Sequence, residues 1–364
     1  MDSLRRDYLS PYNPAVAFTP EIARFAQDAV VFRDAFTRYG ATGLSVPALW
    51  AGAPLLHKQY VTPFAPMNTL AKLLRHEGYA QWIGMDNIVE VIVQPSAALA
   101  PLDAGVMVKD FRFCRTLGEL EQRLAARSPG DPPVFVYTLP QDIHVSAITR
   151  DGGGSLDGAY PGFSAPVASR VRRFDACFGR FVGELRRLGL YDDSLILLTS
   201  DHGDSLGEEG RVGHAYGLFP EVIRIPLIVS FPARLRARFA SPPSAPVYNT
   251  DITPTLYRLL GHELAPSTPL LGRSLIALPG EPAAESRDSM VASSYGAVYG
   301  ALLDDATRLY IVDTVNVREY GYALEPDQRD EAIAVDANLR SRGQRTIRET
   351  IQALADLHGF APAP

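Results

Sequence analysis

The sequence of 364 residues is poor in cysteine and has no long apolar run. Its two cysteines, Cys114 and Cys177, lie far apart and form no metal-ligand motif. One disulfide would fit the count without being required, but Cys177 falls on the apolar side of an expected helix, which favours a buried thiol. No run of about 18 apolar residues occurs, so no membrane-spanning helix is expected. No charged-then-apolar leader opens the sequence either.

The sequence also lacks an excess of positive charge. Its formal net charge is −6 at pH 7. This balance argues against nucleic acid, or an anionic membrane surface, as the main partner. It does not exclude an anionic substrate, because a bound cation can invert the charge of one pocket.

Helix-like and strand-like apolar patterns alternate along most of the chain. Short, mostly apolar segments predict strands over residues 30–32, 79–85, 133–139, 195–198 and 225–231, and the run over 133–139 is continuously apolar. Three- and four-residue apolar spacing predicts helices that begin near residues 20, 68, 116, 167 and 251; Thr116 and Glu119 form a capping-box pattern. Strands that alternate with helices predict an α/β fold with a doubly wound, mostly parallel sheet flanked by helices.

The pattern changes beyond about residue 280. Short apolar runs over residues 290–292, 298–303 and 309–312 predict antiparallel strands, and a final helix is expected over residues 345–357. We therefore expect one large domain over residues 1–280 and a small C-terminal α+β subdomain over residues 281–364.

The strongest chemical signal is Ser-Asp-His-Gly-Asp-Ser-Leu-Gly-Glu at residues 200–208. It directly follows the expected strand 195–198, and ligands of open α/β sheets bind at the carboxyl ends of strands. Asp201 and His202 offer a carboxylate and an imidazole, ligands that suit Zn or Mn. Taken alone, an Asp-His pair is more often a solvated turn.

The full string resembles the metal-binding segment of the sulfatase and phosphoethanolamine-transferase branches of the alkaline phosphatase superfamily. His214, twelve residues after His202, matches a histidine that contacts substrate in those families. The resemblance continues through residues 224–229 and 251–261, and so covers most of residues 190–275. It implies a hydrolase or transferase that holds one divalent metal ion, Zn or Mn, with Ca or Mg as alternatives.

A second signal surrounds Thr42. Thr42 stands ten residues before Gly52, the spacing that sulfatases use for their nucleophile. It is also followed by two residues and then Ser-Val-Pro, as in phosphoethanolamine transferases. A Thr-Gly pair alone would indicate a helix cap or a turn. Because both resemblances select the same residue, we expect Thr42 to be the nucleophile and a metal ligand.

The identity of this residue separates two chemistries. Sulfatases oxidise a cysteine or serine here to formylglycine and usually carry arginine four residues later, whereas this chain has Thr42 and Val46. Threonine cannot form that aldehyde. A metal-bound threonine alkoxide suits in-line attack on phosphorus and a phosphothreonine intermediate. The sequence therefore favours a phosphoester or phosphodiester hydrolase, or a phospho-group transferase, over a sulfuric ester hydrolase.

Asp2 is a further expected metal ligand. The resemblance implies that it completes a metal shell with Thr42, Asp201 and His202. In the family an apolar strand delivers this carboxylate, so we expect that the chain is truncated just inside its first core strand. A lost upstream segment could then include a membrane anchor, with a periplasmic or membrane-anchored location. The alternative interpretation is a frayed, charged terminus.

Two more candidates lie in expected loops. His144 follows the strand 133–139, where family members place a histidine that contacts substrate or a second cation. A lone histidine in a loop is also commonly a surface residue. Lys58, next to His57, is a weaker candidate for binding a phosphate oxygen.

The expected reaction uses Thr42 as the nucleophile, His214 as the proton donor and His144 to orient the phosphoryl group or the acceptor. The expected substrate is a small-molecule, lipid or glycan ester. Three alternatives remain: a sulfatase, a cofactor-independent phosphoglycerate mutase, which should show a fuller two-metal ligand set, and a non-catalytic binding domain that keeps the fold.

Overall fold

The computed structural model describes residues 1–56, 64–150, 159–214, 216–236, 239, 245–262, 272–276, 288–325 and 330–359. The chain divides into two compact units, each drawn from three segments. Unit 1 comprises Met1–Phe32, Ala71–Ser200 and Pro226–Pro242. Unit 2 comprises Arg33–Leu70, Asp201–Ile225 and Pro243–Pro364. The chain passes from unit 2 to unit 1 within helix α3 (Thr69–His76).

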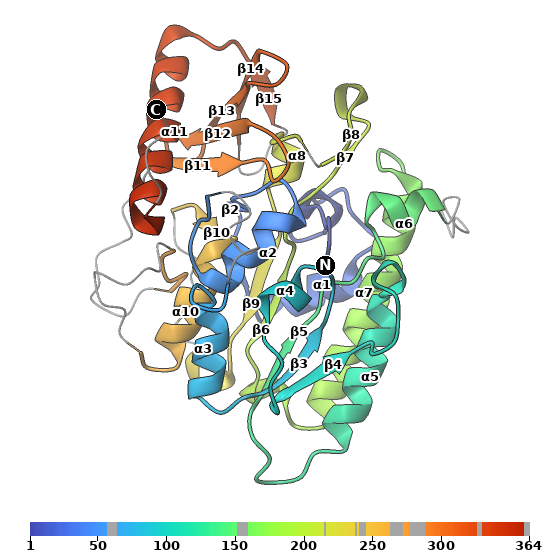
Figure 1. The fold of residues 1–364 in the computed structure, drawn as a ribbon. Helices are drawn as coiled ribbons and strands as arrows, with labels where there is room; N and C mark the ends of the chain where they lie inside the picture. The colour runs from blue at the N-terminus through green and yellow to red at the C-terminus, as the bar shows by residue number, and fades with distance from the viewer. Residues whose placement is uncertain are drawn as a thin grey trace. The chain divides into compact units, whose positions relative to one another are not determined.

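The strands of unit 1 form two three-stranded sheets among the described residues (Figure 1). They are β1 (Val30–Val31), β3 (Ala80–Gly84), β4 (Leu99–Leu102), β5 (Val134–Tyr137), β6 (Ile196–Thr199) and β9 (Leu227–Ser230). Strand β3 pairs in parallel with both β4 and β5, whereas β9 runs antiparallel to both β1 and β6. The parallel strands and their connecting helices confirm the predicted α/β class. A continuous apolar run carries no direction, so the sequence could not reveal the antiparallel β9.

Strand β5 is less buried than its apolar sequence suggests. It pairs with β3 alone among the described strands, and Val136 is 38% exposed. Among the described strands of unit 1, the fully buried one is instead β9, whose four residues are all buried.

Unit 1 contains the long helix α7 and several shorter helices. They are α1 (Pro20–Gln27), α4 (Val89–Ile92), α5 (Phe113–Ala125), α6 (Val145–Arg150), α7 (Ala165–Arg187) and α9 (Ala233–Arg236), with 3₁₀ turns at Arg6–Tyr8, Val108–Asp110 and Tyr191–Asp193. Helices α1 and α5 both pack on α7 (Figure 1). The rings of Phe25 and Phe178 join α1 to α7 at 4.9 Å between centroids, and those of Phe113 and Phe174 join α5 to α7 at 4.4 Å. These edge and tilted aromatic contacts fix the apolar faces that the periodicity predicted.

Two expectations about α5 and α7 are wrong. Cys177 is buried on α7 as predicted, but it forms a disulfide with Cys114 on α5, with the two Cα atoms 5.4 Å apart. Periodicity places a residue on a helix face but cannot show which residue of another helix faces it. Thr116 also does not cap α5, which begins at Phe113. Its hydroxyl donates to the carboxylate of Asp103, and Glu119 accepts from the Asp103 backbone N–H, so both serve the preceding loop.

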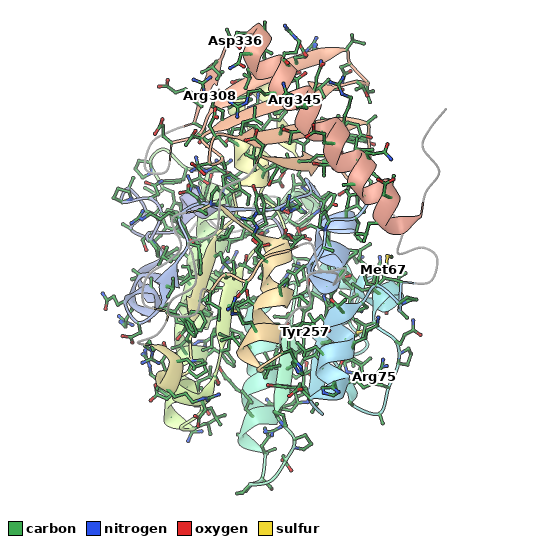
Figure 2. All side chains as sticks on the ribbon, turned by 90° about the vertical axis from the view of Figure 1, so that its left-hand side faces the viewer. Met67, Arg75, Tyr257, Arg308, Asp336 and Arg345 are labelled. Carbon is green, nitrogen blue, oxygen red and sulfur yellow. A yellow bond between two sulfur atoms is a disulfide. The ribbon has the colours of Figure 1, made fainter. Side chains whose placement is uncertain are left out.

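Unit 2 contains a five-stranded antiparallel sheet with one long helix against it (Figure 1). Its elements are β11 (Ser289–Ala292), β12 (Val298–Leu303), β13 (Arg308–Asp313), β14 (Arg318–Ala323), β15 (Glu331–Ile333) and α11 (Ala337–His358). The predicted C-terminal strands and helix are confirmed, and the helix begins at Ala337 rather than near residue 345. Asp336, labelled at the start of α11 in Figure 2, accepts a hydrogen bond from the Leu339 N–H. The proposed division at residue 280 stays a prediction.

The sheet of unit 2 is buried on both faces. Side chains alternate along β12, so that Ala301 and Leu303 pack with α11 residues such as Leu354. Leu302 points to the other face, where it joins a cluster that includes Phe36. The shorter elements of unit 2 are β2 (Ala35–Phe36), α2 (Thr42–Ala51), β7 (Ser205–Leu206), β8 (Val212–Gly213), α8 (Pro220–Ile223), β10 (Val247–Tyr248) and α10 (Ile252–Leu259), with 3₁₀ turns at Glu208–Gly210 and Asn249–Asp251.

None of the helices in the described part of the chain combines the length and the apolar character needed to cross a membrane.

Candidate active site

Thr42 is the first residue of α2, a helix that is otherwise buried. Ala41 precedes it in an extended conformation as the N-cap residue, and residues 43–51 are all buried. Thr42 itself is half-buried. Gly52 ends the helix with a φ of 66°, a left-handed conformation that favours glycine. The spacing from Thr42 to Gly52 is therefore the length of one short helix whose first residue carries the hydroxyl.

The loop before Thr42 is fixed by close packing within unit 2. A Cβ atom at Gly40 would lie 2.5 Å from the Gly217 carbonyl oxygen, so only glycine fits there. The Gly40 N–H donates to the Ala292 carbonyl at the end of β11. Tyr39 is fully buried and donates to the Leu55 carbonyl, and burial raises the pKa of its phenol so that it stays protonated. These contacts hold the start of α2 in one position.

His202 lies beside Thr42 with a defined orientation. Its Nδ1 is 2.8 Å from the Gly203 carbonyl oxygen, which can only accept, so Nδ1 donates. In the neutral imidazole, Nε2 must then be an acceptor. Nε2 lies 3.1 Å from the Thr42 hydroxyl, so the hydroxyl donates to it. Both Asp201 and His202 are buried.

A carboxylate oxygen faces the same nitrogen. Asp201 Oδ2 lies 3.3 Å from His202 Nε2, while Asp201 Oδ1 accepts from the His202 backbone N–H. Two lone pairs that face each other in a buried site repel unless a proton or a cation lies between them. Two ligands about 2.0–2.1 Å from a tetrahedral ion lie about 3.3 Å apart. The spacings from His202 Nε2 to Asp201 and to Thr42 both fit shared coordination of one divalent cation.

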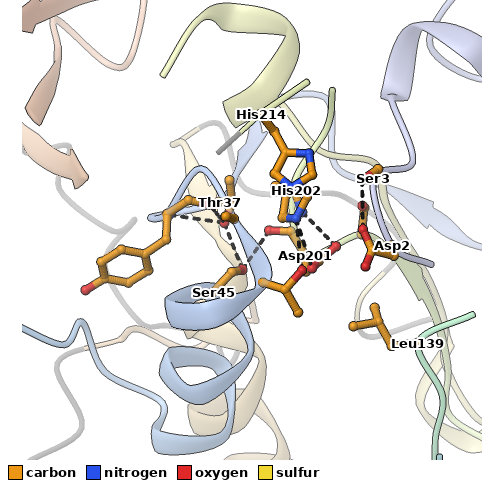
Figure 3. Close-up of polar contacts among 12 residues, drawn as sticks. Asp2, Ser3, Thr37, Ser45, Leu139, Asp201, His202 and His214 are labelled. Atoms are coloured by element: carbon orange, nitrogen blue, oxygen red, sulfur yellow. Dashed lines mark hydrogen bonds and ion pairs between the residues drawn. The ribbon is translucent and has the colours of Figure 1, made fainter. Parts of the chain in front are cut away.

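His214 extends this group. Its ring centroid lies 4.1 Å from that of His202, with an angle of 36° between the planes (Figure 3). Its Nδ1 lies 3.4 Å from a carboxylate oxygen of Asp204, which is 2% exposed. Asp204 lies within the strongest sequence motif, residues 200–208, but its position in that motif did not indicate a role. The structure therefore brings Thr42, Asp201, His202 and His214 together and adds Asp204.

Sequence reasoning also missed a buried hydroxyl network behind the site. Ser45 donates to the Asp201 carbonyl at 2.6 Å. Its hydroxyl also lies 3.0 Å from that of Thr37 (Figure 3). It accepts from the Asn249 amide at 2.7 Å. All three side chains are fully buried. Ser45 lies one helical turn after Thr42, so this network ties the nucleophile helix to the backbone of Asp201. The three-residue spacing in Thr-x-x-Ser was the available signal.

Asp2 and His144 belong to unit 1, and their place in the site stays a prediction. Asp2 is buried, and its carboxylate accepts from the Ser3 hydroxyl at 2.7 Å and from the Gln141 amide at 2.8 Å. His144 precedes α6, where its Nδ1 accepts from the Ser146 N–H at 3.2 Å. His57 and Lys58 lie outside the described residues.

Comparison with known proteins identifies the family. A family model described as Sulfatase matches residues 1–89 and 140–262, more than half of the chain. The chain belongs to the sulfatase family. This membership confirms the resemblance to the alkaline phosphatase/sulfatase superfamily that the residues around Thr42 and Asp201 carried. The likeness to phosphoethanolamine transferases stays a prediction.

Individual relatives agree with this assignment. Steryl-sulfatase of Rattus norvegicus is 27% identical over 258 residues, which cover 60% of this chain and 43% of the relative. The chain thus spans under half the length of this relative. Two solved structures share the fold: an alkaline phosphatase superfamily protein from Vibrio parahaemolyticus and the phosphonate monoester hydrolase of Agrobacterium radiobacter. Their TM-scores are 0.66 and 0.64 at 18% and 17% identity; they cover 99% and 98% of this chain, and the matches cover 87% and 94% of their own.

Proposed function

We propose that the protein is a metal-dependent phosphoester or phosphodiester hydrolase, or a phospho-group transferase, with Thr42 as its nucleophile. The observation that carries this proposal is the position of the Thr42 hydroxyl, 3.1 Å from Nε2 of His202, a nitrogen that also faces the Asp201 carboxylate at 3.3 Å. A cation shared by these three groups would favour the alkoxide form of Thr42 and so activate it as a nucleophile.

The position of Thr42 favours its reactive form. At the first residue of a ten-residue helix, the N–H groups of the first turn and the helix dipole favour negative charge. Both would stabilise an alkoxide at Oγ1 and the anionic group that it attacks. Asp201, His202 and Thr42 would hold a divalent cation, Zn or Mn, which when bound supplies Lewis-acid stabilisation of negative charge. This donor set of carboxylate, imidazole and hydroxyl fits Mg or Ca less well, since those ions prefer oxygen alone.

Asp2 is the proposed fourth ligand. Ser200 directly precedes Asp201 in the chain. The Ser200 hydroxyl donates to the Met1 carbonyl at 2.9 Å and accepts from the Leu4 N–H at 3.0 Å. The segment that carries Asp2 is therefore anchored to the residue before Asp201 in the chain.

The proposed reaction has two steps. The Thr42 hydroxyl loses its proton to solvent water, and its oxygen then forms a bond to phosphorus while the bond from phosphorus to the leaving oxygen breaks and His214 gives that oxygen a proton. Water or an alcohol then attacks the phosphothreonine and gives its proton to His214, and the Thr42 oxygen leaves as the alkoxide. Asp204, 3.4 Å from His214 Nδ1, would orient that imidazole. His144 would orient the phosphoryl group or the acceptor. The proposed substrate is a small-molecule, lipid or glycan ester.

Sulfate ester hydrolysis is the second candidate. The family match and the similarity to steryl-sulfatase favour it. Against it stands the nucleophile, because threonine has a methyl group on Cβ and cannot be oxidised to the aldehyde that sulfatases use.

A substrate panel separates these candidates. Turnover of an aryl phosphate monoester, an aryl phosphodiester and an aryl sulfate is measured after chelation and after addition of Zn, Mn, Mg or Ca. Wild type is compared with Thr42→Ala, and Thr307→Ala, an exposed threonine on a turn of unit 2, is the matched control. We expect metal-dependent cleavage of a phosphoester that Thr42→Ala loses and Thr307→Ala keeps. Cleavage of the sulfate alone would support the second candidate. A folded protein that cleaves none would support a non-catalytic domain.

A further inference from the structure

Unit 2 exposes aromatic and apolar side chains close to the proposed nucleophile. Tyr216 is 65% exposed, Tyr295 is 46% exposed and Val315 is 65% exposed. The rings of Tyr216 and Tyr295 lie 6.4 Å apart between centroids at an angle of 61°. Large apolar side chains that gather on a surface commonly mark a binding site. These three residues are the tyrosine rim.

Contacts within unit 2 connect the tyrosine rim to Thr42 from one side. Tyr216 comes two residues after His214 in the chain. The His214 ring lies 4.1 Å from the His202 ring, and His202 Nε2 lies 3.1 Å from the Thr42 hydroxyl. The backbone after His214 is held in a turn by the Gly217 N–H, which donates to the His214 carbonyl. Tyr216 is thus placed by the same loop that carries the proposed proton donor.

A second set of contacts connects the tyrosine rim to Ala41, the residue before Thr42. Ser294, the residue before Tyr295, donates from its hydroxyl to the Ala41 carbonyl at 2.9 Å. The backbone at Tyr295 is held as well, because its N–H donates to the Ser293 hydroxyl at 3.2 Å. Tyr216 is therefore connected to Thr42 through His214 and His202, and Tyr295 is connected to it through Ser294 and Ala41.

Gly296 lies next to two members of the tyrosine rim, Tyr216 and Val315. A Cβ atom added to Gly296 would lie 3.2 Å from Tyr216 Cδ1 and 3.9 Å from a Val315 methyl carbon. The Tyr216 ring therefore lies against bare backbone, with Val315 beside it. An aromatic ring with a methyl group next to it gives a flat apolar contact area.

We propose that Tyr216 and Tyr295 bind the leaving alcohol of the substrate, and that this alcohol carries a ring, either aryl or pyranose. The proposal rests on Thr42 as the proposed nucleophile. The leaving oxygen must depart near His214, the proposed proton donor, and the tyrosine rim continues from the loop of that residue. A ring with an apolar face stacks on tyrosine, whereas a short alkyl alcohol gains little from the same surface. The two tyrosines thus determine specificity for the alcohol and take no part in the bond-forming step.

Binding of non-hydrolysable analogues tests this inference without turnover. Calorimetry with the Zn-loaded protein compares phenylphosphonate, a glucopyranosylmethyl phosphonate and ethylphosphonate, together with the three matching sulfonates. Wild type is compared with Tyr216→Ala, Tyr295→Ala and Tyr216→Phe, and Met107→Ala, an exposed residue of unit 1, is the control. We expect each alanine variant to weaken binding of the ring ligands by about three- to tenfold and to leave the ethyl ligand unchanged. Phenylalanine should restore binding of the phenyl ligand.

The outcomes separate the two levels of the proposal. Equal binding of ring and ethyl ligands by wild type, or equal losses for both in the alanine variants, would overturn the role of the tyrosine rim. Ring selectivity in the sulfonate series alone would uphold the tyrosine rim and contradict the proposed preference for phosphorus. Selectivity for phenyl over glucopyranosyl, or the reverse, identifies the kind of ring. Loss of turnover in Thr42→Ala is measured separately, so failure of the nucleophile assignment would not be mistaken for failure of the tyrosine rim.

Discussion

Helices α1 and α2 begin in opposite ways. The first turn of α1 is closed by a buried carboxylate from α7, because Asp175 accepts from the Glu21 N–H at 3.1 Å and from the Ile22 N–H at 2.7 Å. The first turn of α2 has no side-chain cap among the described residues and carries the Thr42 hydroxyl instead. Both helix ends favour negative charge. The molecule supplies that charge itself at α1 and leaves the end of α2 to a hydroxyl.

The difference separates a structural helix end from a reactive one. An internal carboxylate at α2 would satisfy the N–H groups but would exclude an anionic substrate. The buried polar groups near α2 lie behind the helix, where Ser45, Thr37 and Asn249 hold the Asp201 backbone. We therefore expect changes at Thr42 to affect turnover, changes at Asp175 to affect stability, and changes at Ser45 to affect both.

The largest expected effect is on turnover at Thr42. Thr42→Val keeps the shape of the side chain and removes only the hydroxyl. We expect turnover to fall by at least about a thousandfold, since a nucleophile has no substitute within its site. Thr42→Ser should keep a substantial part of the activity. Steady-state kinetics check this, with thermal unfolding to show that both variants fold. Turnover by the valine variant equal to that of wild type would contradict Thr42 as the nucleophile and the start of α2 as a reactive helix end.

The next effect concerns the stability of unit 1. Replacing Cys114 and Cys177 together by serine removes the disulfide between α5 and α7. We expect the free energy of unfolding to fall by roughly 2–4 kcal/mol, because the unfolded chain regains the freedom of a long loop. Turnover at a temperature where the variant is folded should stay at the wild-type level. Denaturant unfolding and kinetics on the same samples test both parts. A large loss of turnover without unfolding would place α5 and α7 in the catalytic function.

The hydroxyl network should affect stability and turnover together. Ser45→Ala removes the hydroxyl that donates to the Asp201 carbonyl and accepts from the Asn249 amide, which then keeps its longer contact of 3.3 Å with the Thr37 hydroxyl. We expect a loss of about 1–3 kcal/mol in the free energy of unfolding. We also expect weaker binding of Zn, since Asp201 loses its support. Ser341→Ala, an exposed serine on α11, is the matched control. Zinc titration in competition with a chelator reports on the site independently of turnover. Unchanged zinc affinity would show that the network only stabilises the fold.

The smallest effect is a change of stability with pH at α1. Burial raises the pKa of Asp175 to about 6, although the hydrogen bonds that it accepts from two backbone N–H groups oppose this shift. Between about pH 4 and pH 6 the folded state therefore binds more protons than the unfolded state. The free energy of unfolding should fall as the pH rises through this window, by an amount on the order of 2 kcal/mol.

Asp175→Asn removes this titration. Its stability relative to wild type should therefore rise between pH 4 and pH 7, with turnover unchanged. Thermal unfolding across that range checks the sign. A difference that does not vary with pH would show that Asp175 does not titrate there.

The sequence predicted the elements better than their partners. Apolar periodicity located α7, β3 and the final helix because burial of one face is a local property of the chain. It could not show that β9 is antiparallel or that Cys114 faces Cys177, since both depend on which segments meet. The sequence also predicted that Thr116 starts a helix. In the structure Thr116 lies within α5, and its hydroxyl donates to Asp103.

The site divides in the same way. Thr42, Asp201, His202 and His214 were predicted because their spacing along the chain matches a family pattern. Thr37 and Asn249 were not, because they lie far apart in the sequence and meet Ser45 only in the folded unit. The tyrosine rim was invisible for the same reason, since Tyr216 and Tyr295 come from separate segments.

The most direct test of the central claim is to trap the covalent intermediate. Zn-loaded protein is mixed with an aryl phosphate ester, quenched rapidly in acid, digested and sequenced by mass spectrometry, with Thr42→Ser and Thr42→Val in parallel. We expect a phosphoryl group on residue 42 in wild type and in the serine variant, and none in the valine variant. Turnover without any adduct, or an adduct on another residue, would contradict Thr42 as the nucleophile.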